Sequence, residues 1–400
     1  MRNGINQDNV QKFNRVLVVR LLRNSGSCSR ADLARMSNLK PATITNIVNE
    51  LKELHLIKEE GVINVERGRH GIAVSLDKTY YRVIGLRITR KYFNVGIFDI
   101  EGNELESSTY TLKNGEEPEN IFLRIQDAIE LYINNAKDQK VAAIGCAIPG
   151  PFFRNLEEKD GEYPDWPGIK IKKTLEDRFH VYVFLEHDAN AGALAYNWEM
   201  RVPSEKMLIY FSAAQGIGAG IVNNGKLILG GLGTAGEVGH MCVEKEGLLC
   251  KCGNRGCLEL YCSYHGLVNS INRRLAAGDY SVLKQGSSLS DIKEAVLQGD
   301  RLAVSEYEKA CDYLGIGIVN IVNILNPDII VIGDDLARIS AKIMEERIRQ
   351  VCSRRLYDFV WKNTKLYVVD EKRDISLHGA AIAAIEELFK EQIFFNWVDC

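Results

Sequence analysis

The 400-residue sequence has no apolar segment that approaches the roughly 18 residues needed to span a membrane. Its first residues, MRNGINQDNVQKF, lack the apolar core and the small-residue cleavage site of a secretion signal. Ten cysteines are too few for a disulfide scaffold in a chain of this length. With 46% hydrophobic and 26% charged residues, the composition is that of a soluble globular protein with more than one domain. We therefore expect a cytoplasmic protein without a membrane partner.

The small net charge of −3 conceals an uneven distribution. Residues 1–76 contain 12 Lys and Arg against 7 Asp and Glu, whereas residues 77–400 contain 38 against 46. A small basic N-terminal part therefore precedes a large acidic one.

Residues 1–76 have the pattern of three helices followed by a hairpin. A second helix is predicted after Ser29, whose hydroxyl can form a capping box with Asp32. A third begins near Pro41, a residue suited to a first helical position. Two strand-like runs follow, at 56–62 and 67–76. This order is typical of a winged helix-turn-helix, in which the second helix of the motif enters the major groove of DNA.

The third predicted helix carries small polar residues opposite its apolar face, and basic residues lie before and after it. Thr and Asn can reach base edges, while Arg and Lys contact phosphates. The candidate DNA contacts are Ser29, Arg30, Lys40, Thr43, Thr45, Asn46, Asn49, Arg67 and Arg69. The alternative is a three-helix interaction module with an ordinary solvated polar face. The basic charge of this segment favours DNA.

From residue 82 the periodicity changes to that of an α/β protein. The predicted elements are strands at 82–88, 92–100, 105–112, 141–148, 181–185, 206–212, 218–222 and 328–333, and helices at 117–137 and 189–199. We expect two similar lobes that move as a hinged pair. The predicted domains are 1–76, 77–197 with 379–400, and 198–378.

The most specific motif is GEVGH at 236–240, followed by three closely spaced cysteines. The predicted metal ligands are His240, Cys250, Cys252 and Cys257. One histidine and three cysteines form the closed ligand set that structural Zn²⁺ prefers, and Gly253 and Gly256 supply the turns between them. The alternative is a group of free buried thiols. Cys242 and Cys262 flank the set but fall outside its spacing.

The runs GEVGH, CKCGNRGCLE, LEHDANAGAL and LNPDIIVIG together resemble the ROK family of repressors, open reading frames and sugar kinases. The preceding winged helix resembles its transcriptional-repressor branch, of the xylose-repressor and N-acetylglucosamine-repressor type. The resemblance covers essentially the whole chain. It implies the two-lobed, actin-like (ribonuclease H-like) sugar-kinase fold, with an N-terminal winged helix-turn-helix domain and with sugar bound in a cleft beside the zinc.

By this resemblance, Asp188, Glu237, His240 and Glu259 would contact the sugar, and His187 stands where the family usually has asparagine. Carboxylates can accept several hydroxyl hydrogen bonds, and a zinc-bound His240 keeps its second nitrogen as a donor. Asp188 matches the general base of the family's kinases. The alternatives are that Glu237 and Glu259 orient zinc ligands, and that Asp188 caps the helix that follows it.

The phosphate-binding loops of the family's kinases are altered in this chain. Their first loop, D-x-G-x-T, aligns with residues 87–91, where Arg87 replaces the aspartate and the glycine is missing. Their second loop, G-T-G-x-G, aligns with residues 214–218, which lack the first glycine and the threonine. Asp334 and Asp335 stand where a glycine pair often follows, and they would repel a phosphate. We therefore expect no kinase activity.

These observations predict a DNA-binding transcriptional regulator, a repressor of carbohydrate-metabolism genes, whose zinc-bearing body responds to a sugar or sugar derivative. A homodimer or a dimer of dimers would read a palindromic operator. One alternative is an ATP-dependent sugar kinase with an appended DNA-binding domain. Another is a repressor controlled by a protein partner, for which the apolar C-terminal residues leave room. Those residues are Phe389, Ile393, Phe394, Phe395 and Trp397. Their simpler explanation is a terminal helix packed on the first lobe or at a dimer interface.

Overall fold

The computed structural model describes most of the chain in two compact units. The described residues are 7–65, 69–113, 115–136, 139–150, 166, 168–390 and 393–398. One unit comprises Met1–Ile148, Gly161–Glu186 and Ala380–Cys400, and the other comprises Pro149–Asp160 and His187–Gly379. Within this part of the chain, no helix has the length and apolar character to cross a membrane. The predicted three-domain division, which groups 187–197 with the first lobe, stays a prediction.

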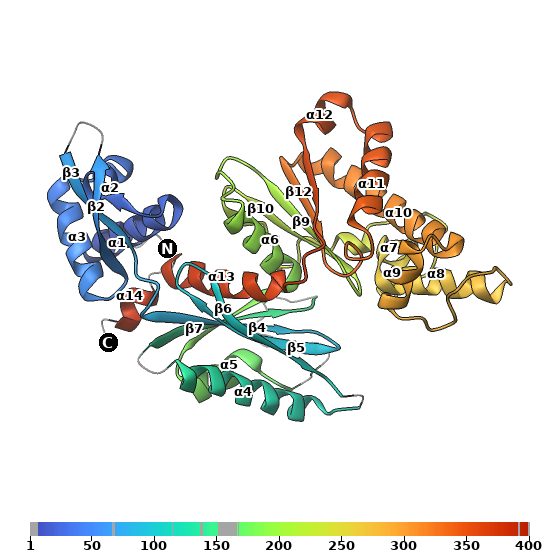
Figure 1. The fold of residues 1–400 in the computed structure, drawn as a ribbon, viewed down its shortest axis with the longest axis horizontal. Helices are drawn as coiled ribbons and strands as arrows, with labels where there is room; N and C mark the ends of the chain where they lie inside the picture. The colour runs from blue at the N-terminus through green and yellow to red at the C-terminus, as the bar shows by residue number, and fades with distance from the viewer. Residues whose placement is uncertain are drawn as a thin grey trace. The chain divides into compact units, whose positions relative to one another are not determined.

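The N-terminal elements form three helices and a small antiparallel sheet (Figure 1). They are α1 (Gln7–Ser25), β1 (Cys28–Ser29), α2 (Arg30–Ser37), α3 (Pro41–Glu53), β2 (Ile57–Val65) and β3 (Arg69–Leu76), with strand order β1-β3-β2. The predicted capping box is present: the Asp32 N–H donates to Ser29 Oγ over 3.1 Å, and the Ser29 N–H donates to Asp32 Oδ2 over 3.2 Å. Strand β1 was not predicted, because two residues carry no periodicity.

The first unit also contains a five-stranded mixed sheet. Its strands are β4 (Tyr81–Ile88), β5 (Tyr92–Asp99), β6 (Glu104–Thr111), β7 (Lys140–Ile148) and β8 (Tyr182–His187), in the order β6-β5-β4-β7-β8. β4 pairs antiparallel with β5 and parallel with β7. Every residue of β4 is buried, because helices cover both faces of the sheet. In Figure 1, α4 (Pro118–Asn135) and α5 (Ile171–Phe179) lie on one face and α13 (Ile375–Lys390) lies on the other.

The second unit repeats this topology. Its strands are β9 (Leu208–Ala213), β10 (Ile217–Asn223), β11 (Lys226–Leu227), β12 (Ile329–Gly333) and β13 (Lys365–Val368), in the order β11-β10-β9-β12-β13. β9 pairs antiparallel with β10 and parallel with β12. Two sheets with the same strand order confirm the duplicated α/β architecture expected from the sequence. Strand β13 was not predicted.

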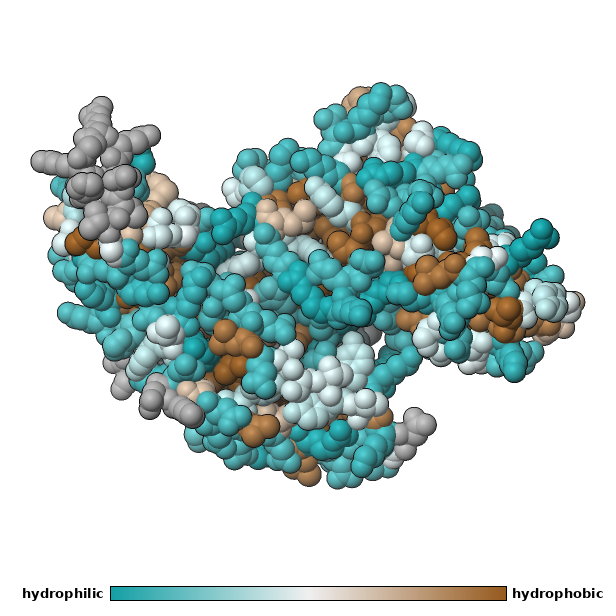
Figure 2. All heavy atoms as spheres, viewed as in Figure 1, coloured by the Kyte–Doolittle hydropathy of each residue, from teal (hydrophilic) through white to brown (hydrophobic). Residues whose placement is uncertain are grey.

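The helices of the second unit pack either directly on its sheet or on another helix. They are α6 (Asp188–Glu199), α7 (Glu259–Cys262), α8 (Tyr264–Ala276), α9 (Leu289–Leu297), α10 (Arg301–Leu325), α11 (Ala341–Arg355) and α12 (Asp358–Asn363). The core includes Ile209, Phe211, Ile330 and Ile332 from the sheet and Leu314 and Ile318 from α10. Outside such cores, hydrophilic residues cover most of the face seen in Figure 2, and hydrophobic ones are scattered over it. The buried core of the second unit holds its sheet and helices together, and the loops described below connect these elements.

The C-terminal residues pack inside the first unit. α14 (Ile393–Val398) carries Phe394 and Phe395, which are both fully buried. Phe394 meets the ring of Tyr81 edge-on at 5.0 Å, and the guanidinium of Arg15 on α1 lies 5.5 Å from the centre of the Phe395 ring. These contacts agree with the terminal-helix explanation of the apolar tail. They also attach the tail to α1 of the N-terminal domain.

Candidate metal centre and ligand site

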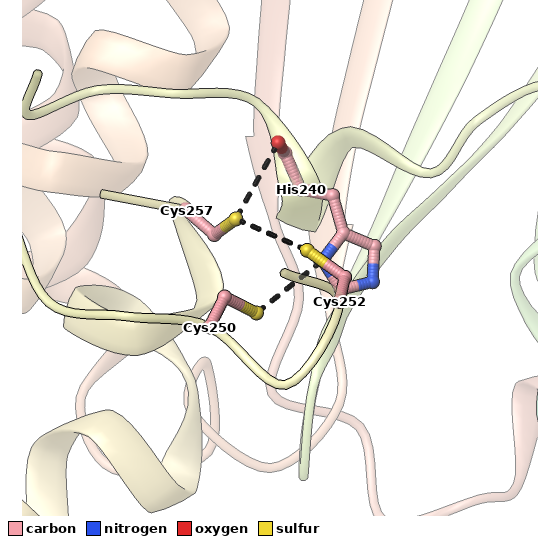
Figure 3. A group of neighbouring side chains, drawn as sticks. All are labelled: His240, Cys250, Cys252 and Cys257. Carbon is pink, nitrogen blue, oxygen red and sulfur yellow. Dashed lines mark hydrogen bonds between the residues drawn. The ribbon is translucent and has the colours of Figure 1, made fainter. Parts of the chain in front are cut away.

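The four predicted metal ligands come together in the second unit (Figure 3). His240 ends the short helix η2 (Val238–His240), and the three cysteines lie on the loop between η2 and α7. Their ligand atoms all lie within 4.8 Å of one another. Cys250 Sγ is 3.7 Å from His240 Nδ1, and Cys252 Sγ is 3.7 Å from Cys257 Sγ. A tetrahedral Zn²⁺ site has edges of about 3.6 Å for S···N and about 3.8 Å for S···S, so this donor set fits such an ion.

Local backbone geometry explains why these residues meet. Gly256 has φ +68, and a Cβ there would lie 1.7 Å from the Glu244 carbonyl oxygen. Gly253 has φ +90 within a turn that its N–H closes by donating to the Cys250 carbonyl over 3.0 Å. Any other residue at either position would have a strained backbone, because both φ angles are positive. At Gly256 its Cβ would also overlap the Glu244 carbonyl oxygen. The predicted roles of both glycines are confirmed.

Without a metal, the thiols differ in their acidity. Burial raises the pKa of Cys257 to about 12, whereas the Asn254 backbone N–H lowers the pKa of Cys252. A metal that binds here must displace the Cys257 proton, because thiolate is the form that binds metal. Acid therefore opposes metal binding at this cluster.

The five side chains predicted at the sugar site belong to this cluster, lie next to it or lie around Gly150. His187 Nε2 is 3.4 Å from Asp188 Oδ1, and both side chains are about four-fifths buried. A Cβ on Gly150 would lie 2.5 Å from His187 Nε2 and 3.2 Å from Glu237 Oε1, so these two groups flank the same backbone. Gly150 was not predicted as a site residue, although it follows a predicted strand in a Pro-Gly-Pro sequence that marks a turn.

Glu259 connects the metal cluster with the 214–218 loop. Its Oε1 lies 3.6 Å from His240 Nδ1 and 3.4 Å from Cys250 Sγ. Its Oε2 lies 3.3 Å from the position that a Cβ on Gly216 would occupy. One oxygen thus faces the metal ligands and the other faces the loop. The geometry is compatible with both roles considered for Glu259, orientation of zinc ligands and contact with a ligand.

Asp188 does not cap α6. The N-cap residue is His187, which makes no side-chain capping bond, and Asp188 is the first helical residue. The capping alternative is therefore wrong, because the helix begins one residue earlier than predicted. The Asp188 backbone carbonyl accepts a hydrogen bond from Ser376 Oγ on α13 over 3.0 Å.

Asp334 makes contacts that the sequence did not reveal. It follows β12 with φ +70, is buried, and accepts hydrogen bonds from Tyr210 Oη at 2.9 Å and Ser212 Oγ at 2.6 Å. Its carboxylate is held inside the second unit by these two hydroxyls. The predicted repulsion between Asp334 and a phosphate stays a prediction. Asp335 lies 3.6 Å from Arg338.

The candidate DNA contacts separate into exposed and occupied residues. The exposed ones are Lys40, Thr45, Asn46 and Asn49, all on α3 or at its start. Thr43 is half-buried, and Ser29 is buried with its hydroxyl in the capping box. Arg30 Nη2 donates to Asn49 Oδ1 at 3.2 Å and to Glu59 Oε1 at 2.9 Å. Arg67 lies outside the described residues, and only the backbone of Arg69, in β3, is described.

Comparisons with known proteins place the chain in a family. The sequence model of the ROK family matches residues 83–387, and the chain belongs to this family. The putative xylose repressor of Caldicellulosiruptor sp. (strain Rt8B.4) is 28% identical, over 95% of this chain and 97% of the relative. The DNA-binding transcriptional dual regulator NagC of Escherichia coli (strain K12) is 29% identical, over 95% of this chain and 93% of the relative.

Solved structures agree with this assignment. A ROK family transcriptional regulator described as a homologue of the E. coli MLC protein has a TM-score of 0.83 at 26% identity, and the match covers 98% of this chain and all of that one. A ROK family glucokinase from Streptomyces griseus, in complex with glucose and AMPPNP, has a TM-score of 0.62 at 27% identity. That match covers 76% of this chain and 99% of the kinase. The expected sugar-kinase fold is therefore confirmed.

Proposed function

We propose that this protein is a DNA-binding transcriptional repressor of carbohydrate-metabolism genes whose body binds a sugar or a sugar derivative. The observation that carries the proposal is similarity along nearly the whole chain to a putative xylose repressor and to NagC, both named as regulators. The winged-helix arrangement of α1 to β3 supports DNA binding, because α3 exposes Thr45, Asn46 and Asn49 beside Lys40. Such readers bind palindromic operators as dimers, so we expect a homodimer or a dimer of dimers.

Zn²⁺ is the metal that we propose for the cluster. Three thiolates and one imidazole suit a structural Zn²⁺ and close its tetrahedron, leaving no position for a substrate. The ion would hold the 240–257 loop, and with it Glu259 at the start of α7. The Zn²⁺ ion would therefore act by fixing the shape of the ligand site and would not react itself.

The sugar contacts that we propose are His187, Asp188, Glu237, His240 and Glu259. Carboxylates are suited to sugar hydroxyls because each oxygen accepts more than one hydrogen bond. His240 presents Nδ1 to the thiols, so Nε2 is the nitrogen left to donate to a sugar oxygen. His187 adds a second imidazole where the family usually has asparagine, which favours an effector different from those of its relatives.

We further propose that the protein is not a sugar kinase. Arg87 is buried on β4 at the position where the kinases have the aspartate of their first phosphate loop. A cation there leaves Mg²⁺ without its carboxylate. Asp188 would then serve as a hydrogen-bond acceptor and not as a general base.

The helix α13 offers a route from the ligand site to the DNA-binding domain. Its first turn carries Ser376, which donates to the Asp188 carbonyl, and its later part carries Glu386, which pairs with Arg23 on α1. α13 therefore contacts the backbone of Asp188 in its first turn and α1 of the N-terminal domain further along. A ligand can use this route only if it binds one arrangement of α13 more tightly than the other.

A thermal-shift screen tests the proposal. The zinc-loaded protein is heated with monosaccharides, amino sugars and their phosphates, and with ATP–Mg²⁺. An operator is selected from a random duplex pool, and its affinity is then measured with and without each stabilising sugar. We expect one sugar class to raise the melting temperature and to change operator affinity, without ATP hydrolysis. Sugar-dependent ATP turnover, or a failure to select any DNA, would contradict the proposal.

A further inference from the structure

Cys242 lies beside the metal cluster without belonging to it. It is exposed, and it is not among the four residues whose ligand atoms converge. It nevertheless forms an isolated antiparallel bridge with the ligand Cys257. The sequence alone placed Cys242 outside the ligand spacing and gave it no role.

The hydrogen bonds around this bridge fix its geometry. The Val243 N–H donates to the Gly256 carbonyl over 2.8 Å, and the Leu258 N–H donates to the Met241 carbonyl over 2.9 Å. These bonds lie on either side of Cys242 and Cys257, which are therefore a non-hydrogen-bonded pair. In such pairs the Cα atoms are about 4.5 Å apart and the side chains leave the same face. This separation falls within the range of about 4.4–6.8 Å that disulfides span.

The two thiols differ in access. Cys257 is fully buried, with its sulfur 3.7 Å from Cys252 Sγ and 3.6 Å from the His240 carbonyl oxygen. Cys242 is exposed to solvent and is not held by the metal. Of these two thiols, Cys242 is therefore the one that an oxidant in solution reaches first, and its cross-strand partner is a metal ligand. Cys252 is also exposed, but a bound metal would hold its thiolate.

We propose that Cys242 and Cys257 form a redox pair that releases the metal when a hydroperoxide oxidises it to a disulfide. The inference rests on the metal centre of the proposed function and adds a second input to it, since relatives are named only for sugar or DNA regulation. Formation of the disulfide removes Cys257 from the four ligands of the cluster.

The chemistry balances. The Cys242 thiolate attacks the hydroperoxide and the O–O bond breaks, so that Cys242 becomes a sulfenic acid. The departing oxygen takes a proton from solvent and leaves as an alcohol or water. The Cys257 thiolate then attacks the Cys242 sulfur, the S–O bond breaks, and the S–S bond forms. The departing hydroxide takes a proton from solvent and leaves as water. Two electrons pass from the two sulfurs to the peroxide. The metal ion keeps its charge and loses one thiolate.

Loss of Cys257 would change the ligand site directly. Cys257 lies two residues before Glu259, whose carboxylate lies against His240 and Cys250. With three donors left, the 240–257 loop is no longer closed around an ion, and Glu259 is no longer held in place. The oxidised protein should therefore respond to its effector less strongly than the reduced one.

Zinc release and disulfide mapping test the proposal on the full-length, zinc-loaded protein. Hydrogen peroxide is added with a chromophoric zinc chelator, and a non-reduced digest is analysed by mass spectrometry. We expect zinc release together with a Cys242–Cys257 disulfide, and recovery of zinc binding after dithiothreitol and added zinc. The variant Cys242→Ser should bind zinc normally before oxidation and release it about tenfold more slowly. The control Cys400→Ser should behave like the wild type.

Two results would overturn the inference. One is a disulfide that joins Cys252 to Cys257 in place of Cys242 to Cys257. The other is an unchanged release rate in Cys242→Ser. The mapping does not depend on the metal, so protein that takes up no zinc would refute the metal centre, while the disulfide found in the digest would still decide whether the pair exists.

Discussion

Arg23 on α1 and Glu386 on α13 form an ion pair, with 3.6 Å between Nη2 of the arginine and Oε1 of the glutamate. Both side chains are about three-quarters buried. Burial raises the pKa of Glu386, although Arg23 opposes this effect, and burial likewise lowers the pKa of Arg23. The pair thus joins the DNA-binding domain to α13 under partial desolvation, where an ion pair adds more to positional specificity than to stability.

The raised pKa of Glu386 predicts a pH-dependent effect of Glu386→Gln. The folded protein binds the Glu386 proton more tightly than the unfolded chain, so the contribution of this group to stability is present below its ordinary pKa of 4.5 and is lost as pH rises through the folded pKa. Glutamine cannot titrate. The urea midpoint of Glu386→Gln relative to wild type should therefore be higher at about pH 7 than at about pH 5. A trend of opposite sign would contradict the explanation.

The contacts of α13 predict variants in which effector binding no longer changes operator affinity, although effector and operator still bind. Arg23→Ala removes the α1 partner of Glu386, and Ser376→Ala removes the hydrogen bond from the first turn of α13 to the Asp188 carbonyl. Neither residue is among the proposed contacts to sugar or DNA. Each variant should keep the ligand-induced thermal shift and the affinity for operator in the absence of ligand. The ratio of operator affinities with and without effector should fall towards unity, a loss of about 1–3 kcal/mol of coupling. Wild-type ratios in both variants would show that α13 does not carry the signal.

Removal of metal ligands predicts loss of zinc and of stability. Cys250→Ser and Cys252→Ser each replace a thiolate that faces His240 or Cys257. Each variant should bind less than stoichiometric zinc and unfold at lower temperature, because binding energy at a structural site is folding energy. Cys242→Ser, which leaves all four ligands, is the matched control. Full zinc content in both ligand variants would exclude this cluster as the metal site.

Much of this site could be predicted from local sequence, because its geometry is local. The ligands His240 to Cys257 lie on one loop, and Gly256 must be glycine since a Cβ would overlap the Glu244 carbonyl. The capping box of α2 is equally local. Pairings over long sequence distances could not be predicted, such as Arg23 with Glu386 or Ser376 with the Asp188 carbonyl. The partners of Asp334, which are Tyr210 and Ser212 on strand β9, could not be predicted for the same reason.

The exposed face of α3 predicts two kinds of effect on DNA binding. Asn46→Ala removes an exposed amide suited to a base edge, and should cost about 1–3 kcal/mol on the selected operator while changing non-specific binding little. Lys40→Ala removes an exposed cation, and should weaken binding to all duplexes and reduce the salt slope by about one. Fluorescence anisotropy over a range of salt concentrations measures both. Lys293→Ala on α9 is the control for charge, and an equal change in its salt slope would remove Lys40 from the contacts.

The variant Glu259→Gln separates the two roles considered for Glu259, which are contact with the sugar and orientation of the zinc ligands. In the wild type, the Glu259 carboxylate lies against His240 on one side and the 214–218 loop on the other. The amide of the variant keeps the shape of this side chain but removes its charge. If Glu259 contacts the sugar, the ligand-induced thermal shift should shrink strongly while zinc stays stoichiometric, because a charged acceptor contributes about 1.5–3 kcal/mol. If it only orients zinc ligands, zinc affinity should fall about 10–100-fold and the shift should follow zinc occupancy. Glu237→Gln, whose carboxylate lies by Gly150, separates the cases further, since its effect on the sugar should appear with zinc affinity unchanged.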